Sequence, residues 1–299
     1  MKILITGGAG FIGSHLVDAL VNLNHEVIVV DNCSANNEKF YFNEKATYHK
    51  FNICDGDDLI KVSVGCDFCF HMAAETRIQD TINNPRKTVE TNILGTLNVL
   101  EACRQNRIKG MIFSSTSSIY GLTDQVPITE SQKEDCLNPY ASTKYAAELL
   151  IKNYNKLYDV KSCILRYFNV FGERAPSKGQ YALVTAIFLR QKTNKESITV
   201  VGDGLQERDF IYVKDIVSAN IKCMEEWDTN PALTVSDIFN IGYGKAITII
   251  ELAKAITNDI VFVDKRKGEA KTNLSSSNKF LKTTGWKPST YVLDWIKTQ

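Results

Sequence analysis

The sequence predicts an α/β fold, in which a doubly wound parallel sheet carries a smaller C-terminal substrate-binding lobe. Three observations predict it. A short apolar segment, Lys2–Thr6, leads directly into a glycine-rich turn, helical periodicity resumes at once over residues 14–22, and similar apolar and helical segments then alternate as far as about Phe168. Strands that alternate with helices are typical of parallel sheets, because each helix carries the chain back to start the next strand.

The elements of the first domain follow in order along the chain. Strands are expected at Lys2–Thr6, at Glu26–Val30, and over residues 67–72, 110–114 and 161–166, where β-branched and aromatic residues are frequent. Helices are expected over residues 14–22 and 89–104, and another begins at Asn138-Pro139. Asparagine is a good helix N-cap and proline suits the first helical position.

Beyond Phe168 the alternation becomes irregular, and we expect a smaller lobe. A loop over residues 172–180 precedes a helix over 181–192 and a strand over 197–201. Residues 209–226 again have the character of a strand followed by a helix, so we expect residues 209–242 to return to the first domain. The first domain then comprises residues 1–168 with 209–242, and the lobe comprises residues 169–208 and 243–299.

Composition limits the possible partners. Hydrophobic residues make up 44% and charged residues 23% of the 299 residues, and the formal net charge is +1, without the basic excess of a nucleic-acid-binding protein. No apolar stretch approaches the roughly 20 residues that cross a bilayer. The chain opens with a strand and a glycine loop and not with a secretory signal. We therefore expect a soluble, cytoplasmic protein that binds neither nucleic acid nor membrane.

The eight cysteines are expected to be reduced thiols, most of them in the core. Cys66 and Cys69 form a C-x-x-C pair, but they precede an apolar strand and have no second pair of ligands. Core packing explains them better than zinc binding or redox chemistry. His15 and His71 lack a metal-ligand or nucleophile partner at a telling spacing, so we expect packing or hydrogen-bonding roles and no metal site.

A dinucleotide site is predicted at the first turn. Gly7, Gly10 and Gly13 lie between a strand and a helix, where glycines allow a tight turn, close approach of a pyrophosphate and close packing of helix on strand. This context makes the fold Rossmann-type. Asp31 ends the second strand, where its carboxylate can bind ribose hydroxyls and repel a 2′-phosphate, and no arginine adjoins it. NAD is thus favoured over NADP, and a merely solvated Asp31 is the alternative.

A catalytic pair is predicted on the helix after Asn138. Tyr140 and Lys144 lie four residues apart on one helical face. The ammonium, together with the positive ring of oxidised NAD, should stabilise a phenolate, lower the tyrosine pKa and make Tyr140 a general base. The strand end over residues 113–118 is rich in hydroxyls and lies at the sheet edge where ligands bind. Without that context, a structural role for the pair would be the better interpretation.

These motifs resemble those of the extended short-chain dehydrogenase/reductase family, and the resemblance spans essentially the whole chain. The motifs are the glycine loop of residues 7–13, the strand that ends in Ile119-Tyr120-Gly121, and Tyr140-Ala141-Ser142-Thr143-Lys144. Residues 166–172, Gly202-Asp203-Gly204, Arg208-Asp209-Phe210 and residues 285–288 resemble the nucleotide-sugar 4-epimerases of the UDP-glucose (UDP-galactose) 4-epimerase type.

The resemblance implies a mechanism. Tyr140 would take the proton of the sugar 4-hydroxyl, Thr116 would bridge that hydroxyl, and Lys144 would hold the nicotinamide ribose while hydride passes from carbon 4 to NAD. Return of hydride to the opposite face of the ketose would invert the centre. The family's 4,6-dehydratases carry Asp-Glu where this chain has Ser117 and Ser118. Dehydratase or 4-ketoreductase activity is the alternative, and a non-catalytic NAD-binding protein is the third hypothesis.

The resemblance also implies a set of ligand-binding residues. Those expected at the cofactor are Gly7, Gly10, Phe11, Ile12, Gly13, Asp31, Asn32, Asn52, Ile53, Ala73, Ala74, Asn92, Ser114, Tyr140, Lys144 and Tyr167. Those expected at the nucleotide sugar, which we expect to be UDP-linked, are Thr116, Ser118, Tyr140, Asn169, Val201, Arg208, Arg266 and Asn273.

Five of these residues have a specific basis. Asn52 stands where relatives carry an aspartate, and its amide can still accept a hydrogen bond. Asn169 is expected at the diphosphate, with Arg208 and Arg266 supplying positive charge. A surface ion pair is the alternative for Arg208, and a solvated basic run for Arg266. Asn273 stands where hexose-specific epimerases often carry tyrosine, so a 2-acetamido group could fit. Relatives pair through helices like residues 89–104 and 140–158, so we expect a homodimer.

Overall fold

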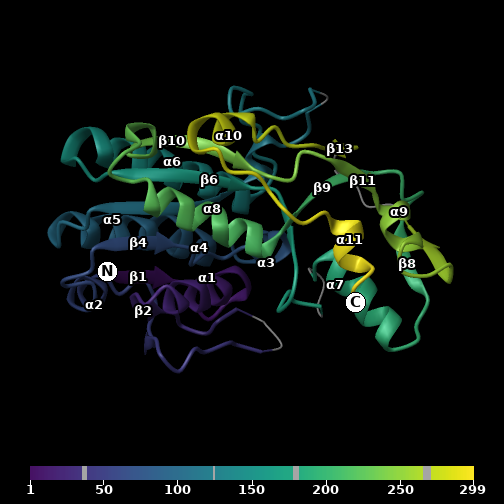
Figure 1. Ribbon diagram of the computed structural model, residues 1–299, viewed down its shortest axis with the longest axis horizontal. Helices are drawn as coiled ribbons and strands as arrows, with labels where there is room; N and C mark the ends of the chain where they lie inside the picture. The colour runs from purple at the N-terminus through teal and green to yellow at the C-terminus, as the bar shows by residue number, and fades with distance from the viewer. Residues whose placement is uncertain (36–38, 124, 178–181, 265–270) are drawn as a thin grey trace.

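The large sheet determines where the ligand site lies. The computed structural model describes residues 1–35, 39–123, 125–177, 182–264 and 271–299 (Figure 1). Seven parallel strands form the sheet in the order β10-β6-β5-β4-β1-β2-β3. They are β1 Lys2–Thr6, β2 Glu26–Val30, β3 Thr47–His49, β4 Phe68–His71, β5 Gly110–Thr116, β6 Ser162–Tyr167 and β10 Val235–Ile241. The strand order reverses between β1 and β4, which is where ligands bind in such sheets.

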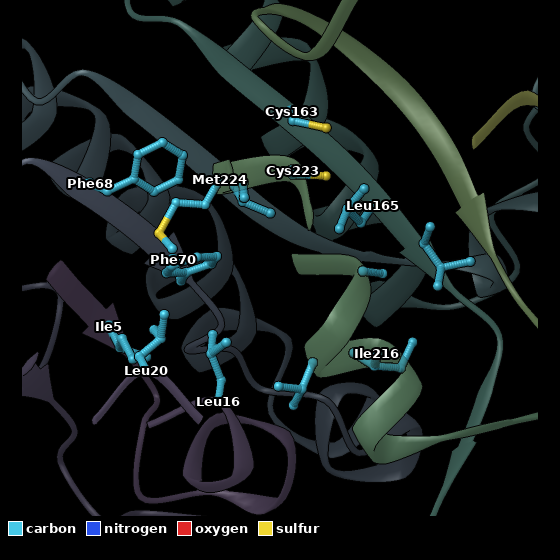
Figure 2. Packing of buried hydrophobic residues seen from close by; sticks show 14 of the residues in the cluster. Ile5, Leu16, Leu20, Phe68, Phe70, Cys163, Leu165, Ile216, Cys223 and Met224 are labelled. Atoms are coloured by element: carbon cyan, nitrogen blue, oxygen red, sulfur yellow. The ribbon is translucent and has the colours of Figure 1, made fainter. Parts of the chain in front are cut away.

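Helices cover both faces of this sheet, which confirms the predicted doubly wound fold. α1 (Phe11–Asn22) and α8 (Val213–Glu225) pack on one face, and Figure 2 shows Leu16, Leu20 and Ile216 in the cluster that includes Ile5 and Phe70. α2 (Gly56–Val62), α5 (Gly95–Gln105) and α6 (Pro139–Tyr158) belong to the opposite layer. Strands buried on both sides have near-continuous apolar sequences, which explains why they could be recognised.

The helix expected over residues 89–104 differs from the prediction. It consists of α4 (Pro85–Val89), a π-helical turn (Glu90–Leu94) and α5, preceded by the short α3 (Ile78–Asn83). The wider turn contains the buried Asn92, whose backbone oxygen accepts a hydrogen bond from Thr96 Oγ1 at 2.7 Å. π turns insert one residue without altering the apolar stripe much, so periodicity alone does not reveal them.

The smaller lobe is built around one strand. β9 (Glu207–Tyr212) pairs with β7 (Asn169–Phe171), β11 (Ala246–Thr248) and β13 (Thr272–Asn273). β8 (Ile198–Val201) pairs with β12 (Ile260–Val263). Helices α7 (Val184–Thr193), α9 (Ile249–Lys254) and α11 (Val292–Ile296) accompany these strands at the right of Figure 1. Residue 181, where the helix of this lobe was expected to begin, lies outside the described residues.

The return to the large sheet begins later than expected. The strand within residues 209–226 is β9, which pairs with strands of the lobe, whereas α8 packs against α1 and β10 extends the large sheet beside β6. A sequence pattern can identify a strand, but it does not show to which sheet the strand belongs. Near β10, α10 (Asn278–Thr284) adds Phe280 to the core. None of the helices in the described ranges is long and apolar enough to cross a membrane.

Candidate cofactor and substrate site

A cavity of about 800 Å³ lies at the carboxyl end of the large sheet, next to the lobe. Its wall combines the β1–α1 loop, the ends of β2, β4, β5 and β6, the start of α6, and residues 168–170 and 182–187. The predicted site residues in this wall are Gly7, Gly10, Phe11, Ile12, Gly13, Asp31, Asn32, Asn52, Ile53, Ala73, Ala74, Ser114, Thr116, Ser118, Tyr140, Lys144, Tyr167 and Asn169. The residues predicted to bind the cofactor and those predicted to bind the substrate therefore share one cavity.

The three glycines have different roles in the first turn. Gly7 has φ +75°, and a Cβ there would lie 2.7 Å from Ala73 N. A Cβ on Gly13 would lie 2.2 Å from Gly7 O, so the helix could not approach the strand. A Cβ on Gly10 would meet Gly7 O alone, at 3.4 Å, and Gly10 lines the cavity. The N-terminus of α1 has no side-chain cap, so its amides fit a pyrophosphate.

Asp31 is held in a fixed orientation at the end of β2. One carboxylate oxygen accepts a hydrogen bond from Ala9 N at 3.0 Å and the other from Cys33 N at 2.8 Å. Each oxygen keeps a further acceptor position, which suits the two hydroxyls of a ribose. Asn32 and Asn52 line the same part of the cavity, and the Asn52 oxygen accepts from Cys54 N at 3.0 Å.

The start of α6 places Tyr140 at the cavity. Asn138 Oδ1 accepts a hydrogen bond from Ala141 N at 2.9 Å, and Pro139 is the first helical residue, as predicted. Burial raises the pKa of Tyr140, and a hydrogen bond with Thr116 partly offsets this effect. Desolvation is the larger of these two effects, so the expected lowering of the tyrosine pKa is not produced by this chain alone. The positive charge of oxidised NAD would have to supply it.

Lys144 is a buried amine on the same helix as this tyrosine. It is 3% exposed, lines the cavity, and its Nζ lies 3.9 Å from the centroid of the Phe113 ring. Burial lowers its pKa to about 7, and Glu148 partly opposes this shift. Among the ion pairs of the described residues, none involves Lys144. A buried amine that faces the cavity without a carboxylate partner fits the ribose hydroxyls of a cofactor.

Hydroxyl groups follow one another along the end of β5. Ser114 Oγ and Tyr167 OH are 3.0 Å apart, and Tyr167 OH donates to Asn220 Oδ1 at 3.0 Å. Thr116 Oγ1 accepts from Ser118 N at 3.1 Å and donates to Ser118 Oγ at 3.2 Å. This geometry fixes the Thr116 hydroxyl next to Tyr140, where it can orient an alcohol of the substrate.

A buried ion pair behind this wall was missed by the sequence reasoning. Arg166 Nε donates to Glu148 Oε1 at 3.0 Å and Arg166 Nη2 donates to Glu148 Oε2 at 2.7 Å, and both side chains are 0% exposed. Ser115 Oγ also donates to Glu148, at 2.5 Å. The pair joins α6, the helix of Tyr140 and Lys144, to β5 and β6. An arginine inside an apolar strand requires a buried acid as its partner, so the position of Arg166 in the sequence was the signal that could have revealed this pair.

Asn92 does not lie in the cavity wall. It is 2% exposed, accepts from Glu75 N at 2.8 Å, and donates to Glu75 O and Thr143 Oγ1, both at 3.0 Å. Thr143 in turn donates to the backbone oxygen of Tyr140 at 3.0 Å. The structure therefore places Asn92 as a brace between the β4–α3 loop and the start of α6.

A charged section of the wall was also missed. Glu75, Arg77, Asp80 and Lys87 line the cavity on the side of α3 and α4, and Glu75 and Lys87 form an ion pair at 2.7 Å. Glu75 comes soon after β4, at the sheet edge where ligands bind, so its place after a buried strand was the available signal.

The residues expected at the nucleotide occupy the lobe. Asn169 Nδ2 donates to Asp209 O at 2.8 Å and to Asn273 Oδ1 at 2.9 Å, and Asn273 is paired with Arg208 across β13 and β9. Asn169 lines the cavity, whereas Val201, Arg208 and Asn273 lie outside its wall. Arg208 Nη1 donates to Glu207 O at 2.8 Å. Arg266 lies outside the described residues.

The histidines and cysteines occupy structural positions. His71 Nδ1 is 2.7 Å from Thr6 Oγ1, its Nε2 is 2.9 Å from Thr96 Oγ1, and burial lowers its pKa to about 3. His15 Nε2 is 2.9 Å from Glu173 O. Cys66 and Cys69 are free, buried thiols, and the described part of the chain contains no cluster of His, Cys, Asp and Glu suited to a metal ion.

Comparison with known proteins agrees with this geometry. The sequence model of the NAD dependent epimerase/dehydratase family matches residues 3–242. A protein of Methanocaldococcus jannaschii is 37% identical over 303 residues, which cover 99% of this chain and 96% of that protein. The UDP-glucose 4-epimerase of Thermotoga maritima, solved with UDP-glucose, is 33% identical and has a TM-score of 0.91 over 99% of this chain and 96% of its own.

A second similar structure is that of an enzyme named for an N-acetylated sugar. The UDP-N-acetylglucosamine 4-epimerase of Methanobrevibacter ruminantium is 33% identical, with a TM-score of 0.86 over 100% of this chain and 98% of its own. The predicted fold, the predicted family and the choice of NAD are confirmed by these matches. The chain belongs to the NAD-dependent epimerase/dehydratase family, as an NAD-dependent enzyme of the epimerase type.

Proposed function

We propose that this enzyme is a nucleotide-sugar 4-epimerase, which acts on a UDP-hexose or a UDP-N-acetylhexosamine by transient oxidation at carbon 4 with bound NAD. The observation that carries the proposal is the convergence of Tyr140, Lys144 and Thr116 on one cavity, between the glycine loop and Asn169 of the lobe. The names of the relatives from T. maritima and M. ruminantium support the substrate class.

The chain's own groups have distinct parts in this reaction. NAD supplies the hydride acceptor when it is bound. The Tyr140 phenolate accepts the proton of the 4-hydroxyl, and Thr116, anchored through Ser118 at 3.1 Å, orients that hydroxyl. The Lys144 ammonium donates hydrogen bonds to ribose hydroxyls and stabilises the phenolate. Glu148 and Arg166 keep the helix that carries Tyr140 and Lys144 fixed against β5 and β6.

The sugar and nucleotide would extend toward the lobe. Asn169 is the lobe residue that both lines the cavity and contacts Asn273, so it is the group best placed for the diphosphate. Arg208 and Arg266 are proposed to add positive charge there. A compact amide at Asn273 leaves more room than a tyrosine would, which supports acceptance of a 2-acetamido group.

The dehydratase alternative has less support. Thr116 is followed in the cavity wall by Ser117 and Ser118, and hydroxyls cannot replace the acid pair that eliminates water. A 4-ketoreductase that uses NADPH conflicts with the fixed carboxylate of Asp31, which would repel a 2′-phosphate.

We also propose a homodimer. Val89, Leu94 and Leu149 are 46%, 44% and 46% exposed, on α4, the π turn and α6 respectively, and α6 contacts both neighbours. Exposed apolar side chains on adjoining helices suit a two-fold four-helix interface. Light scattering after size exclusion should give twice the mass of the chain, and Leu149→Asp should give a monomer.

The activity test needs no added reductant. Purified protein is incubated with UDP-glucose, UDP-galactose and their N-acetylated counterparts, and the products are resolved by NMR. We expect the 4-epimer, lost in Tyr140→Phe, and a preference between the sugar pairs that Asn273→Tyr shifts toward the hexoses. Unchanged sugars in all four incubations would refute the proposal, and a 4-keto-6-deoxy product would mean that the enzyme is a dehydratase.

A further inference from the structure

We infer that Phe113 is a positioning residue for Lys144: the face of its aromatic ring holds the lysine ammonium at the cavity wall and stabilises the charged form. The inference rests on the role proposed above for Lys144, which must be a cation to donate to the ribose and to stabilise the Tyr140 phenolate. A residue of the protein core would then help to keep Lys144 protonated.

The geometry is that of a close cation–π contact. Lys144 Nζ lies 3.9 Å from the ring centroid, well within the roughly 6 Å over which such contacts are significant. Phe113 is 0% exposed and lies in the middle of the sheet, where β5 pairs with β4 at His71 and with β6 at Ile164. The ring is therefore a rigid surface of fixed orientation, and water cannot replace it.

Few ionisable groups around Lys144 can stabilise its charge. On α6 itself, Tyr140 carries no charge in its protonated form, and both carboxylate oxygens of Glu148 accept hydrogen bonds from Arg166 of β6. On β4, His71 is neutral above about pH 3.

Across the cavity, Glu75 pairs with Lys87 and Asp80 adds a second carboxylate to the wall, but neither acid forms an ion pair with Lys144. Burial by itself drives an ammonium toward the neutral amine, and the residual field of Glu148 opposes this only in part. The negative face of the Phe113 ring, 3.9 Å from Nζ, thus favours the cation at close range.

The direct test measures the titration of Lys144 while the ring is changed electronically and not in shape. Phenylalanine with one, two or three ring fluorines replaces Phe113, because fluorine withdraws charge from the ring face and leaves the side chain nearly the same size. The protein is labelled with ¹³C at lysine Cε, and the Lys144 signal is the one absent from Lys144→Met. With each fluorine the midpoint of the Lys144 titration should move to lower pH, by about one pH unit for the trifluorinated ring.

The matched control is the same series at Phe70. This residue is also 0% exposed, on the neighbouring strand, and its cluster lies on the other face of the sheet; none of the cations in the described part of the chain lies over its ring. Fluorination there should leave the Lys144 midpoint unchanged. An unchanged midpoint in a folded Phe113 series, or equal shifts in both series, would overturn the inference.

The titration uses protein without substrate, so its outcome does not depend on the proposed reaction. A second readout connects it to the cofactor. The pH above which NAD affinity falls should move down in the Phe113 series and stay constant in the Phe70 series. If the epimerase proposal failed, the titration would still decide the role of Phe113.

Discussion

Substitutions in the glycine loop should separate effects on folding stability from effects on NAD binding. A methyl group at Gly10 would find open space apart from Gly7 O at 3.4 Å, whereas one at Gly13 would lie 2.2 Å from Gly7 O and 2.8 Å from Gly8 Cα. Gly10 also has a negative φ, −80°, which alanine adopts without strain. Gly10→Ala should therefore leave the free protein intact and fill only the space above the turn.

The expected magnitudes differ between the two variants. Overpacking by one methyl group costs about 1–3 kcal/mol. At Gly10 this cost should appear in NAD binding, as a dissociation constant raised by about 5- to 150-fold. At Gly13 it should appear in folding, as an unfolding midpoint lowered by roughly 2–4 °C for each kcal/mol.

Calorimetric titration with NAD and thermal unfolding of the nucleotide-free protein measure the two effects separately. The reasoning predicts that Gly10→Ala unfolds within about 2 °C of the wild type, given a stability change below about 0.5 kcal/mol. Wild-type NAD affinity in Gly10→Ala would refute the proposed path of the pyrophosphate. A wild-type unfolding midpoint in Gly13→Ala would refute the role assigned to the helix–strand contact.

Three further predictions concern charge. Glu148→Gln leaves the buried Arg166 cation with only its ion pair to Glu134, at 3.2 Å. It should lower the free energy of unfolding by up to about 3–5 kcal/mol in urea titrations, whereas Glu101→Gln, at a partly exposed pair with Arg104, should cost at most about 1 kcal/mol. Because the Lys144 pKa is lowered to about 7, the unfolded chain binds more protons above that pH. The stability of the wild type should therefore rise relative to Lys144→Met between about pH 7 and pH 10, and urea titrations with parallel slopes against pH would contradict this. Asp31→Asn should bind NADP more tightly relative to NAD, and an unchanged ratio of the two dissociation constants would contradict the role of that carboxylate.

Much of the fold was predictable because the relevant signals are local. β1 and β2 have the predicted bounds, Lys2–Thr6 and Glu26–Val30, since strands buried on both faces have continuous apolar sequences. α6 begins where Asn138 and Pro139 predict it, because a cap and a fixed φ act within one turn. Neither signal carries information on which strands pair, so β9 was assigned to the wrong sheet.

The site was predictable where a motif places a residue at the sheet edge, and less so where the structure depends on distant partners. Tyr140, Lys144, Thr116 and the glycines all line the cavity. The pairing of Glu148 on α6 with Arg166 on β6 joins residues 18 positions apart, and no local pattern specifies it. The pKa of Tyr140 depends on how deeply the folded chain buries it, and the sequence does not show that burial raises it. The lowering predicted from Lys144 together with oxidised NAD stays a prediction.

In the proposed reaction, carbon 4 loses a hydride to NAD and regains the same hydride. The most direct test uses the UDP-sugar that the enzyme epimerises, carrying deuterium at carbon 4, in ordinary water. The mechanism predicts that the deuterium stays at carbon 4 of the epimer, as followed by NMR and mass spectrometry. Loss of the label to water would mean that a proton and not a hydride leaves carbon 4, and would contradict the account.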